Sequence, residues 1–125
     1  MSACILWIDS EHANLFQISS EKVSKKSLKL KEKKHSNSHQ DQHKHEAEEH
    51  FFHEIAETIG SIEELLIFGP GLAKNRFKTH LEKHHHQPLL KSVVGVEPLD
   101  HLTDNQILEA GRKFFKKYNL YNSKI

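Results

Sequence analysis

The chain has 125 residues, enough for one hydrophobic core but not for two, so we expect a single domain over residues 1–125. The hydrophobic content of 36% and the mean hydropathy of −0.67 describe a polar chain, and no apolar run in it approaches the length needed to span a bilayer. We therefore expect a cytoplasmic protein with no membrane partner. The formal net charge is +1, and the one cysteine, Cys4, excludes an internal disulfide bond.

The first third of the chain predicts three strands and a loop. Residues 3–8 and 14–18 are rich in β-branched and aromatic side chains and are joined by a short polar turn, which indicates a hairpin. Residues 23–30 alternate loosely between apolar and polar side chains and fit an edge strand, whose lysines discourage pairing with another molecule. Residues 33–45 consist of Lys, His, Ser, Asn, Gln and Asp, which predicts a mobile loop.

A helix is predicted over residues 46–59. Phe51, Ile55 and Ile59 recur every four residues and form an apolar stripe along one side. Gly60 follows directly and fits the position at which glycine ends a helix.

Two more strands and two more helices complete the pattern. The apolar run 65–68 predicts a buried strand, residues 72–84 an amphipathic helix, and the valine-rich stretch 89–96 another strand. Thr103 and Gln106 have the spacing of a capping box at the start of the last helix. The order β-β-β-α-β-α-β-α predicts an α/β fold, in which helices pack on a mixed sheet.

Basic side chains gather in two segments that are candidates for contact with RNA or another anion. Local patches steer anionic partners even at low net charge, and N–H groups at a helix start attract anions. The candidate residues are Lys25, Lys26, Lys29, Lys31, Lys33, Lys34, Gly69, Gly71, Lys74, Asn75 and Arg76. The Gly69-Pro70-Gly71 turn matches neither nucleotide-binding glycine motif. A tight turn, with glycine supplying a positive φ, is the simpler interpretation.

A polar cluster is predicted at Asp100, His101 and Asp104, directly after the valine-rich strand. Open α/β sheets bind ligands at the carboxyl ends of their strands, so these residues are a candidate site. The alternative is a histidine that only orders its own loop through hydrogen bonds.

Histidine is unusually frequent, at 12 of 125 residues. His39 and His43 are four residues apart and could share a metal ion if their segment were helical. Neither a His-Glu-x-x-His motif nor a cysteine pair accompanies them, so we expect no dedicated cofactor, only adventitious Zn²⁺ or Ni²⁺. A nucleophile elbow is also lacking, and nothing beside Cys4 would lower its pKa, so no enzyme is predicted.

Several segments together resemble a known family. They are residues 6–9 with 13–16, the histidine-rich loop, residues 51–54, the GPG-x-AK segment 69–74, and the VGVE-x-x-DH-x-TD-x-Q segment 94–106. These segments look like the small bacterial translational machinery proteins, single-domain relatives of the archaeo-eukaryotic release factor and Pelota C-terminal domain. The resemblance covers nearly the whole chain and implies a fold akin to that of kink-turn-binding ribosomal proteins. It does not imply peptide release, because the Gly-Gly-Gln tripeptide is missing.

The resemblance implies an association with ribosomes or translation factors. Together with the basic patches, it predicts a non-catalytic module that associates with the ribosome, RNA or a translation factor through those patches. One alternative is a small-ligand or nucleotide-binding domain with its site at the GPG turn and the Asp100-His101 loop. A second alternative is a metal-binding interaction module that uses the histidine-rich loop.

Overall fold

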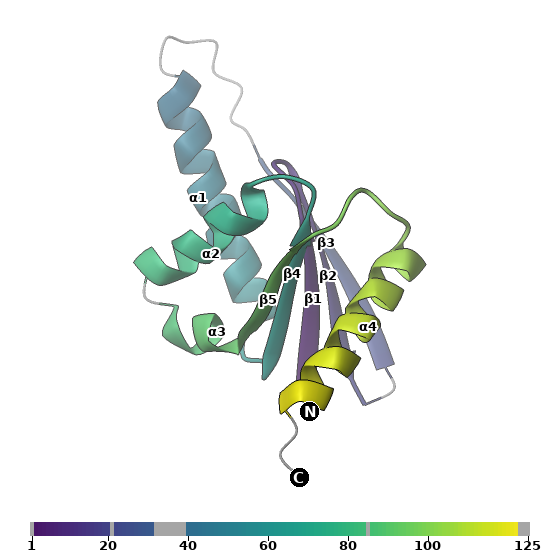
Figure 1. The fold of residues 1–125 in the computed structure, drawn as a ribbon. Helices are drawn as coiled ribbons and strands as arrows, with labels where there is room; N and C mark the ends of the chain where they lie inside the picture. The colour runs from purple at the N-terminus through teal and green to yellow at the C-terminus, as the bar shows by residue number, and fades with distance from the viewer. Residues whose placement is uncertain (1, 21, 32–39, 85, 123–125) are drawn as a thin grey trace.

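The computed structural model describes residues 2–20, 22–31, 40–84 and 86–122, and within them five strands and four helices follow one another in the order β-β-β-α-β-α-α-β-α (Figure 1). The elements are β1 Ser2–Ile8, β2 His12–Ser19, β3 Lys22–Lys29, α1 Gln40–Ile59, β4 Glu64–Gly69, α2 Ala73–Lys83, α3 Gln87–Ser92, β5 Val93–Pro98 and α4 Asp104–Asn122. None of the helices described is long and apolar enough to cross a membrane.

The sheet has the strand order β3-β2-β1-β4-β5, with β1 at its centre. β1 runs antiparallel to β2 and parallel to β4, so Ile5 lies opposite Phe16 on one side and Leu66 on the other. A strand that is covered on both faces reads as a continuous apolar run, and residues 4–8 are all buried. The mixed sheet confirms the predicted α/β class.

Helices cover both faces of the sheet: α1, α2 and α3 lie on one face and α4 on the other (Figure 1). Because successive strand residues point to opposite faces, β1 contributes to two hydrophobic cores, so the expectation of one core was wrong. Cys4, Leu6 and Ile8 pack beneath α1, α2 and α3, whereas Ile5 and Trp7 pack beneath α4.

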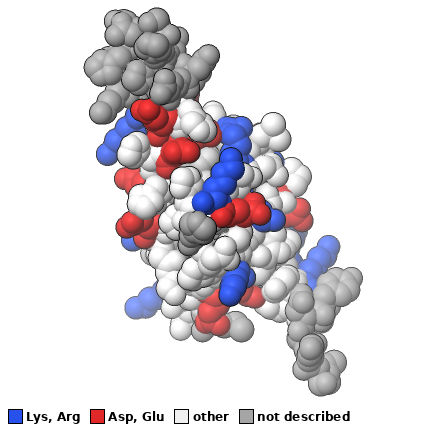
Figure 2. All heavy atoms as spheres, turned by 90° about the vertical axis from the view of Figure 1, so that its left-hand side faces the viewer, with Lys and Arg blue, Asp and Glu red and all other residues white. Residues whose placement is uncertain are grey.

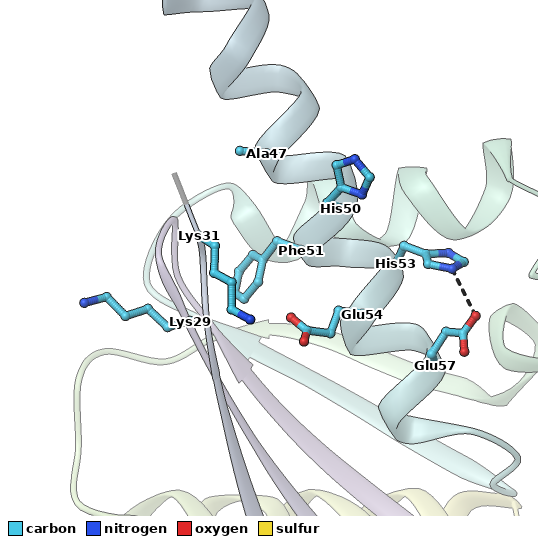
Figure 3. A pocket seen from close by; sticks show the side chains of 8 residues that line it. All are labelled: Lys29, Lys31, Ala47, His50, Phe51, His53, Glu54 and Glu57. Carbon is cyan, nitrogen blue, oxygen red and sulfur yellow. Dashed lines mark ion pairs between the residues drawn. The ribbon is translucent and has the colours of Figure 1, made fainter. Parts of the chain in front are cut away.

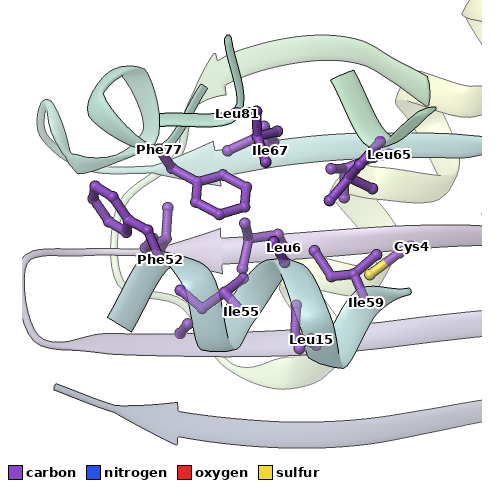
Figure 4. Packing of buried hydrophobic residues seen from close by; sticks show 14 of the residues in the cluster. Cys4, Leu6, Leu15, Phe52, Ile55, Ile59, Leu65, Ile67, Phe77 and Leu81 are labelled. Atoms are coloured by element: carbon purple, nitrogen blue, oxygen red, sulfur yellow. The ribbon is translucent and has the colours of Figure 1, made fainter. Parts of the chain in front are cut away.

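The larger core joins α1 and α2 to the sheet (Figure 4). Phe52 and Ile55 of α1 and Phe77 of α2 meet Leu6 of β1 in this cluster. The rings of Phe52 and Phe77 contact edge to face, with centroids 5.6 Å apart. The apolar stripe that predicted α1 is therefore the surface that holds α1 on the sheet.

The smaller core depends on a close approach of α4. Gly111 lies so near β1 that a Cβ atom at this position would overlap the side chain of Ile5. The predicted capping box is confirmed at the start of α4. The N–H of Thr103 donates to Oε1 of Gln106 at 3.0 Å, and the N–H of Gln106 donates to Oγ1 of Thr103 at 3.3 Å.

The strand predicted over residues 89–96 is wrong in its first half. Leu89 belongs to α3, and β5 begins at Val93. Pro88 lies in the first turn of α3, where its missing N–H leaves no hydrogen bond unmade. Leu89 is buried in the larger core, so an apolar residue there serves a helix rather than a strand.

The loop predicted over residues 33–45 is wrong from residue 40 onward, because α1 begins at Gln40. The remainder of that prediction, up to residue 39, lies outside the described residues. The end of α1 is as predicted. Gly60 has a φ of 67°, and its N–H donates to the carbonyl of Ala56 at 3.1 Å.

Candidate functional site

A carboxylate and an imidazole meet at the carboxyl ends of the parallel strands. Asp9 follows β1 and His101 follows β5, and Nε2 of His101 lies 3.1 Å from Oδ2 of Asp9. The other oxygen of Asp9 accepts hydrogen bonds from the N–H groups of Glu11 at 2.9 Å and His12 at 2.6 Å. The β1–β2 turn therefore holds the carboxylate that faces His101.

Trp7 fixes the other side of this pair. Its indole Nε1 donates to the carbonyls of Leu99 at 3.2 Å and Asp100 at 3.1 Å. The ring of His101 contacts the indole edge to face, with centroids 4.7 Å apart. The last residues of β1 thus position the loop between β5 and α4 by both hydrogen bonds and ring packing.

The pair shifts the pKa of each partner. Burial raises the pKa of Asp9, but hydrogen bonds from Glu11, His12 and His101 outweigh it, so this pKa lies below its ordinary value. The hydrogen bond to Asp9 raises the pKa of His101 above that of a free histidine. The imidazolium–carboxylate form is consequently favoured over a wider pH range than these groups would show apart.

The structure brings together only part of the predicted polar cluster. The N–H of His101 donates to Oδ1 of Asp100 at 2.7 Å, so these two residues are in contact. Asp104 instead pairs with Lys25 of β3, with 2.7 Å between Nζ and Oδ2. Asp9 was not predicted as a member, although its place directly after a central strand is the signal that could have revealed it.

The GPG turn lies at the same edge of the sheet, because the N–H of Leu99 donates to the carbonyl of Gly69 at 3.0 Å. The predicted reason for its glycines is wrong, since neither Gly69 nor Gly71 has a positive φ. A Cβ at Gly69 would overlap the carbonyl oxygen of Ile8, whereas a Cβ at Gly71 would meet no atom within 4 Å. Gly69 is therefore needed for the close approach of two strands.

The cations that follow the turn face the domain itself. Lys74 is buried, and its ammonium donates to the carbonyl of Gly71. Nε and Nη2 of Arg76 pair with the carboxylate of Glu48 on α1 at 3.0 and 3.1 Å. Asn75 remains exposed. Lys74 and Arg76 thus hold α2 to its own turn and to α1, which leaves them less available to an outside anion.

The basic residues of β3 remain at the surface. Lys25 and Lys26 lie on opposite faces of this edge strand, since Lys25 is opposite Phe16 and Lys26 is opposite Leu15. Lys25 also lies over the ring of Phe16, 5.9 Å from its centroid. The other exposed lysines of this segment are Lys22, Lys29 and Lys31. The predicted contacts Lys33 and Lys34 lie outside the described residues.

A pocket of about 520 Å³ separates the end of β3 from α1 (Figure 3). Lys31 and Glu54 point toward one another across it, and Phe51 forms its apolar floor (Figure 3). Its lining residues are Lys29, Lys31, Ala47, His50, Phe51, His53, Glu54 and Glu57. The lysines come from the strand side and the carboxylates from the helix side, so the pocket is lined by both positive and negative charges.

Three histidines converge on the helical face of the domain. They are His53 of α1, His80 of α2 and His86 just before α3, and their ligand nitrogens all lie within 4.8 Å of one another. Burial and the neighbouring His84 and His86 lower the pKa of His80 to about 4. The predicted metal ligands, the side chains of His39 and His43, lie outside the part described.

The face formed by α1, α2 and α3 carries mixed charge. Figure 2 shows basic and acidic side chains interleaved among neutral ones over this side of the molecule. Such a surface has no large field of one sign that would attract a polyanion. Of the described surfaces, the β3 edge is the stronger candidate for contact with an anion.

Comparison with known proteins identifies the fold. No family model matches the chain, and no curated protein matches its sequence. Pelota from Archaeoglobus fulgidus superposes with a TM-score of 0.66 at 21% identity, over 94% of this chain and 32% of that one. The domain has a Pelota-like fold. At this identity the likeness shows the fold alone, and the bacterial family suggested by the sequence stays a prediction.

Two further solved structures share this fold. The archaeal translation termination factor aRF1 gives a TM-score of 0.58 at 14% identity, over 96% of this chain and 40% of that chain. Dom34 of S. cerevisiae, a translation termination-like factor that interacts with Hbs1, gives a TM-score of 0.54 at 12% identity, over 94% of this chain and 36% of that chain. The chain thus spans between about a third and two fifths of the length of these three proteins.

Proposed function

We propose that this Pelota-like domain is a non-catalytic module of the translation apparatus that contacts RNA phosphates through β3. The observation that carries the proposal is the fold, which is shared with a translation termination factor and with a termination-like factor. Since fold alone does not determine function, the contact surface must come from this chain's own residues.

The β3 edge supports this surface on chemical grounds. Its lysines are exposed on both faces of the strand, and β3 lies at the edge of the sheet. Each lysine that neutralises a phosphate releases a counterion, which gives affinity without sequence readout. Lys25 pairs with Asp104 of α4, which leaves it less available to a phosphate than the other lysines of this edge.

The chemistry of the described residues favours binding over catalysis. Cys4 is fully buried, and burial raises the pKa of its thiol to about 12, so the thiolate nucleophile is not formed at neutral pH. His101 and Asp9 are held together by loop contacts that suit an ordering role.

Ribosome co-sedimentation at about 50 mM and about 200 mM salt tests the proposal, because phosphate contacts weaken steeply over this range. Replacing Lys26 and Lys29 with serine should weaken binding and lower the slope of log affinity against log salt by about 1.4 to 1.8, according to the strandedness of the RNA. The control replaces Lys113 and Lys117 of α4, which are also exposed. Binding that is absent at low salt, or equally lost in the control, would overturn the proposal.

A small-ligand site at the carboxyl edge of the sheet is a second candidate. It is favoured by the hydrogen bond from Leu99 to Gly69, which places the GPG turn beside the loop of His101. Titration with inorganic phosphate and with ATP, followed by the imidazole signals of His101 in NMR, tests it. Saturable shifts at His101 support the site, and unchanged signals exclude these ligands.

A further inference from the structure

The geometry points to a zinc site formed by His53, His80 and His86, and we propose that it joins α1, α2 and the start of α3. The three imidazoles come from three segments that meet only in the folded chain. His53 also lines the pocket beside Lys29 of β3, but the test of this site uses zinc without RNA, so it does not depend on the proposed function. The site also differs from the loop histidines that the sequence suggested.

The ligand atoms are close to the spacing that zinc requires. Nitrogens about 2.0–2.1 Å from a tetrahedral ion lie roughly 3.3 Å from one another. The three ligand nitrogens are within 4.8 Å, so closure needs movements of about 1 Å. His53 is exposed and His86 is partly exposed, and the terminal torsion of a histidine is soft, so both rings can supply that movement.

His80 provides an independent sign that a ligand belongs there. Its side chain is only 7% exposed, and its Nε2 is buried with no hydrogen-bond partner among the described residues. An unsatisfied buried polar atom costs roughly 1–3 kcal/mol, which is why such atoms are rare in native proteins. A metal ion bonded to Nε2 would remove this cost. The edge of Phe52 fixes the ring of His80 from the core side, with centroids 5.6 Å apart.

A carboxylate lies behind one of the three histidines, as is common at metal sites. Oε1 of Glu57 lies 3.0 Å from Nε2 of His53, which leaves Nδ1 of that ring free to face an ion. His84 is a neighbour on the other side, with its ring centroid 4.3 Å from that of His80 and its Nε2 3.8 Å from Glu49. The fourth position can be filled by water.

Imidazole ligands without thiolates suit Zn²⁺, Cu²⁺ and Ni²⁺. We assign Zn²⁺ because it adopts tetrahedral geometry without redox chemistry, as expected for an ion that cross-links helices. A ligand that binds only the folded chain raises its stability. The site would thus add a metal cross-link between α1 and α2, which already meet through the Phe52–Phe77 contact and the Arg76–Glu48 ion pair.

Calorimetry with ZnCl₂ tests the site, together with imidazole ¹H–¹⁵N NMR on the same samples. The test variants are His53→Ala and His86→Ala, which remove side chains that are not buried, and circular dichroism verifies their folding. The control variant replaces both His39 and His43 with alanine, and a second control is the exposed His45→Ala. Each variant keeps most of the chain's histidines, so nonspecific binding is matched.

We expect calorimetry to show one tight zinc-binding site in the wild type and in both controls. In the NMR spectra, zinc should change the imidazole chemical shifts of His53, His80 and His86. Removing one of the three ligands should weaken binding at least about tenfold, the lower limit seen when only outer-shell partners are lost. Tight binding that survives His53→Ala and His86→Ala but disappears in the His39/His43 control would overturn the proposal. The proposal would also be overturned if zinc changed the chemical shifts of other histidines but left those of His80 unchanged.

Discussion

Nε2 of His101 lies 3.1 Å from Oδ2 of Asp9, although 92 residues separate them in the chain. The sheet makes this contact, because β1, β4 and β5 run parallel and their carboxyl ends share one edge. Asp9 follows the first of these strands and His101 the last, so the pair spans the end of β4. The contact therefore reports whether the parallel half of the sheet is assembled.

Replacing Asp9 with asparagine should lower the pKa of His101 toward its ordinary value. The hydrogen bond to Asp9 is the largest cause of the raised pKa, whereas Asp100 contributes less. An NMR titration of the imidazole Cε1–H measures the change, and Asp100→Asn is the matched control. An unaltered titration in the Asp9 variant would show that the pair does not form in solution.

The same pair should make stability depend on pH. His101 has a raised pKa, so its contribution is fully present below the ordinary histidine value of about 6.5 and is lost as the pH rises through its folded value. Asp9 has a lowered pKa, so its contribution is present above about 3.9 and is lost as the pH falls through its folded value. Urea midpoints of wild type and Asp9→Asn should differ most between about pH 4 and 6.5. A difference that grows above pH 8 would contradict this assignment.

Gly69→Ala should destabilise the domain by about 1–3 kcal/mol, the usual cost of overpacking. The new methyl would meet the carbonyl oxygen of Ile8, a backbone atom that cannot turn aside as a side chain can. Gly71→Ala changes the same turn but meets no atom within 4 Å, and should alter stability by less than about 0.5 kcal/mol. Urea unfolding of both variants makes the comparison, and equal losses would exclude the close approach as the cause.

Cys4 should be inert toward a thiol reagent in the folded protein. It is fully buried, and burial raises its pKa to about 12, so both access and thiolate formation are suppressed. Labelling with a chromogenic disulfide should follow the unfolding curve in urea, with the unfolded chain reacting at once. Rapid stoichiometric labelling in native buffer would contradict the buried position.

Asp104→Asn should strengthen RNA binding if the β3 edge is the contact surface. The change releases Lys25 from its ion pair and leaves that cation free for a phosphate, which steepens the salt dependence by about 0.7 to 0.9. The loss of an exposed pair should cost no more than about 1 kcal/mol in stability. Glu109→Gln, which breaks the exposed pair with Lys113 on α4, is the control. An equal gain in affinity from both variants would assign the effect to net charge alone.

Periodicity predicted most of the fold because packing follows it. The four-residue spacing of Phe51, Ile55 and Ile59 is the buried stripe of α1, and the run 65–68 is the buried strand β4. Composition was less reliable: residues 40–45 were predicted as loop from their polarity, yet they form the start of α1. A polar stretch can belong to a helix as well as to a loop, so polarity alone does not distinguish the two.

The candidate site was harder to predict, because its contacts join distant segments. The rule for carboxyl strand ends found Asp100 and His101, but Asp9 was interpreted only as part of a turn. The sequence suggested a metal pair at His39 and His43, which are four residues apart, whereas the cluster in the structure joins His53 of one helix to His80 of another. The spacing of residues in the sequence predicts which side chains are neighbours on one helix, but it does not predict which side chains meet between two helices.

The central strand β1 precedes both of its neighbours, β2 and β4, in the chain, which has a consequence for how the sheet is formed. β1 pairs with β2 at once, but its other edge pairs with β4, where Ser2 and Glu63 bond across 61 residues. Long-range parallel pairing is slow because loop closure precedes any gain from contacts. During synthesis the edge of β1 stays open until β4 has emerged, so the nascent hairpin is the stage most exposed to wrong strand partners.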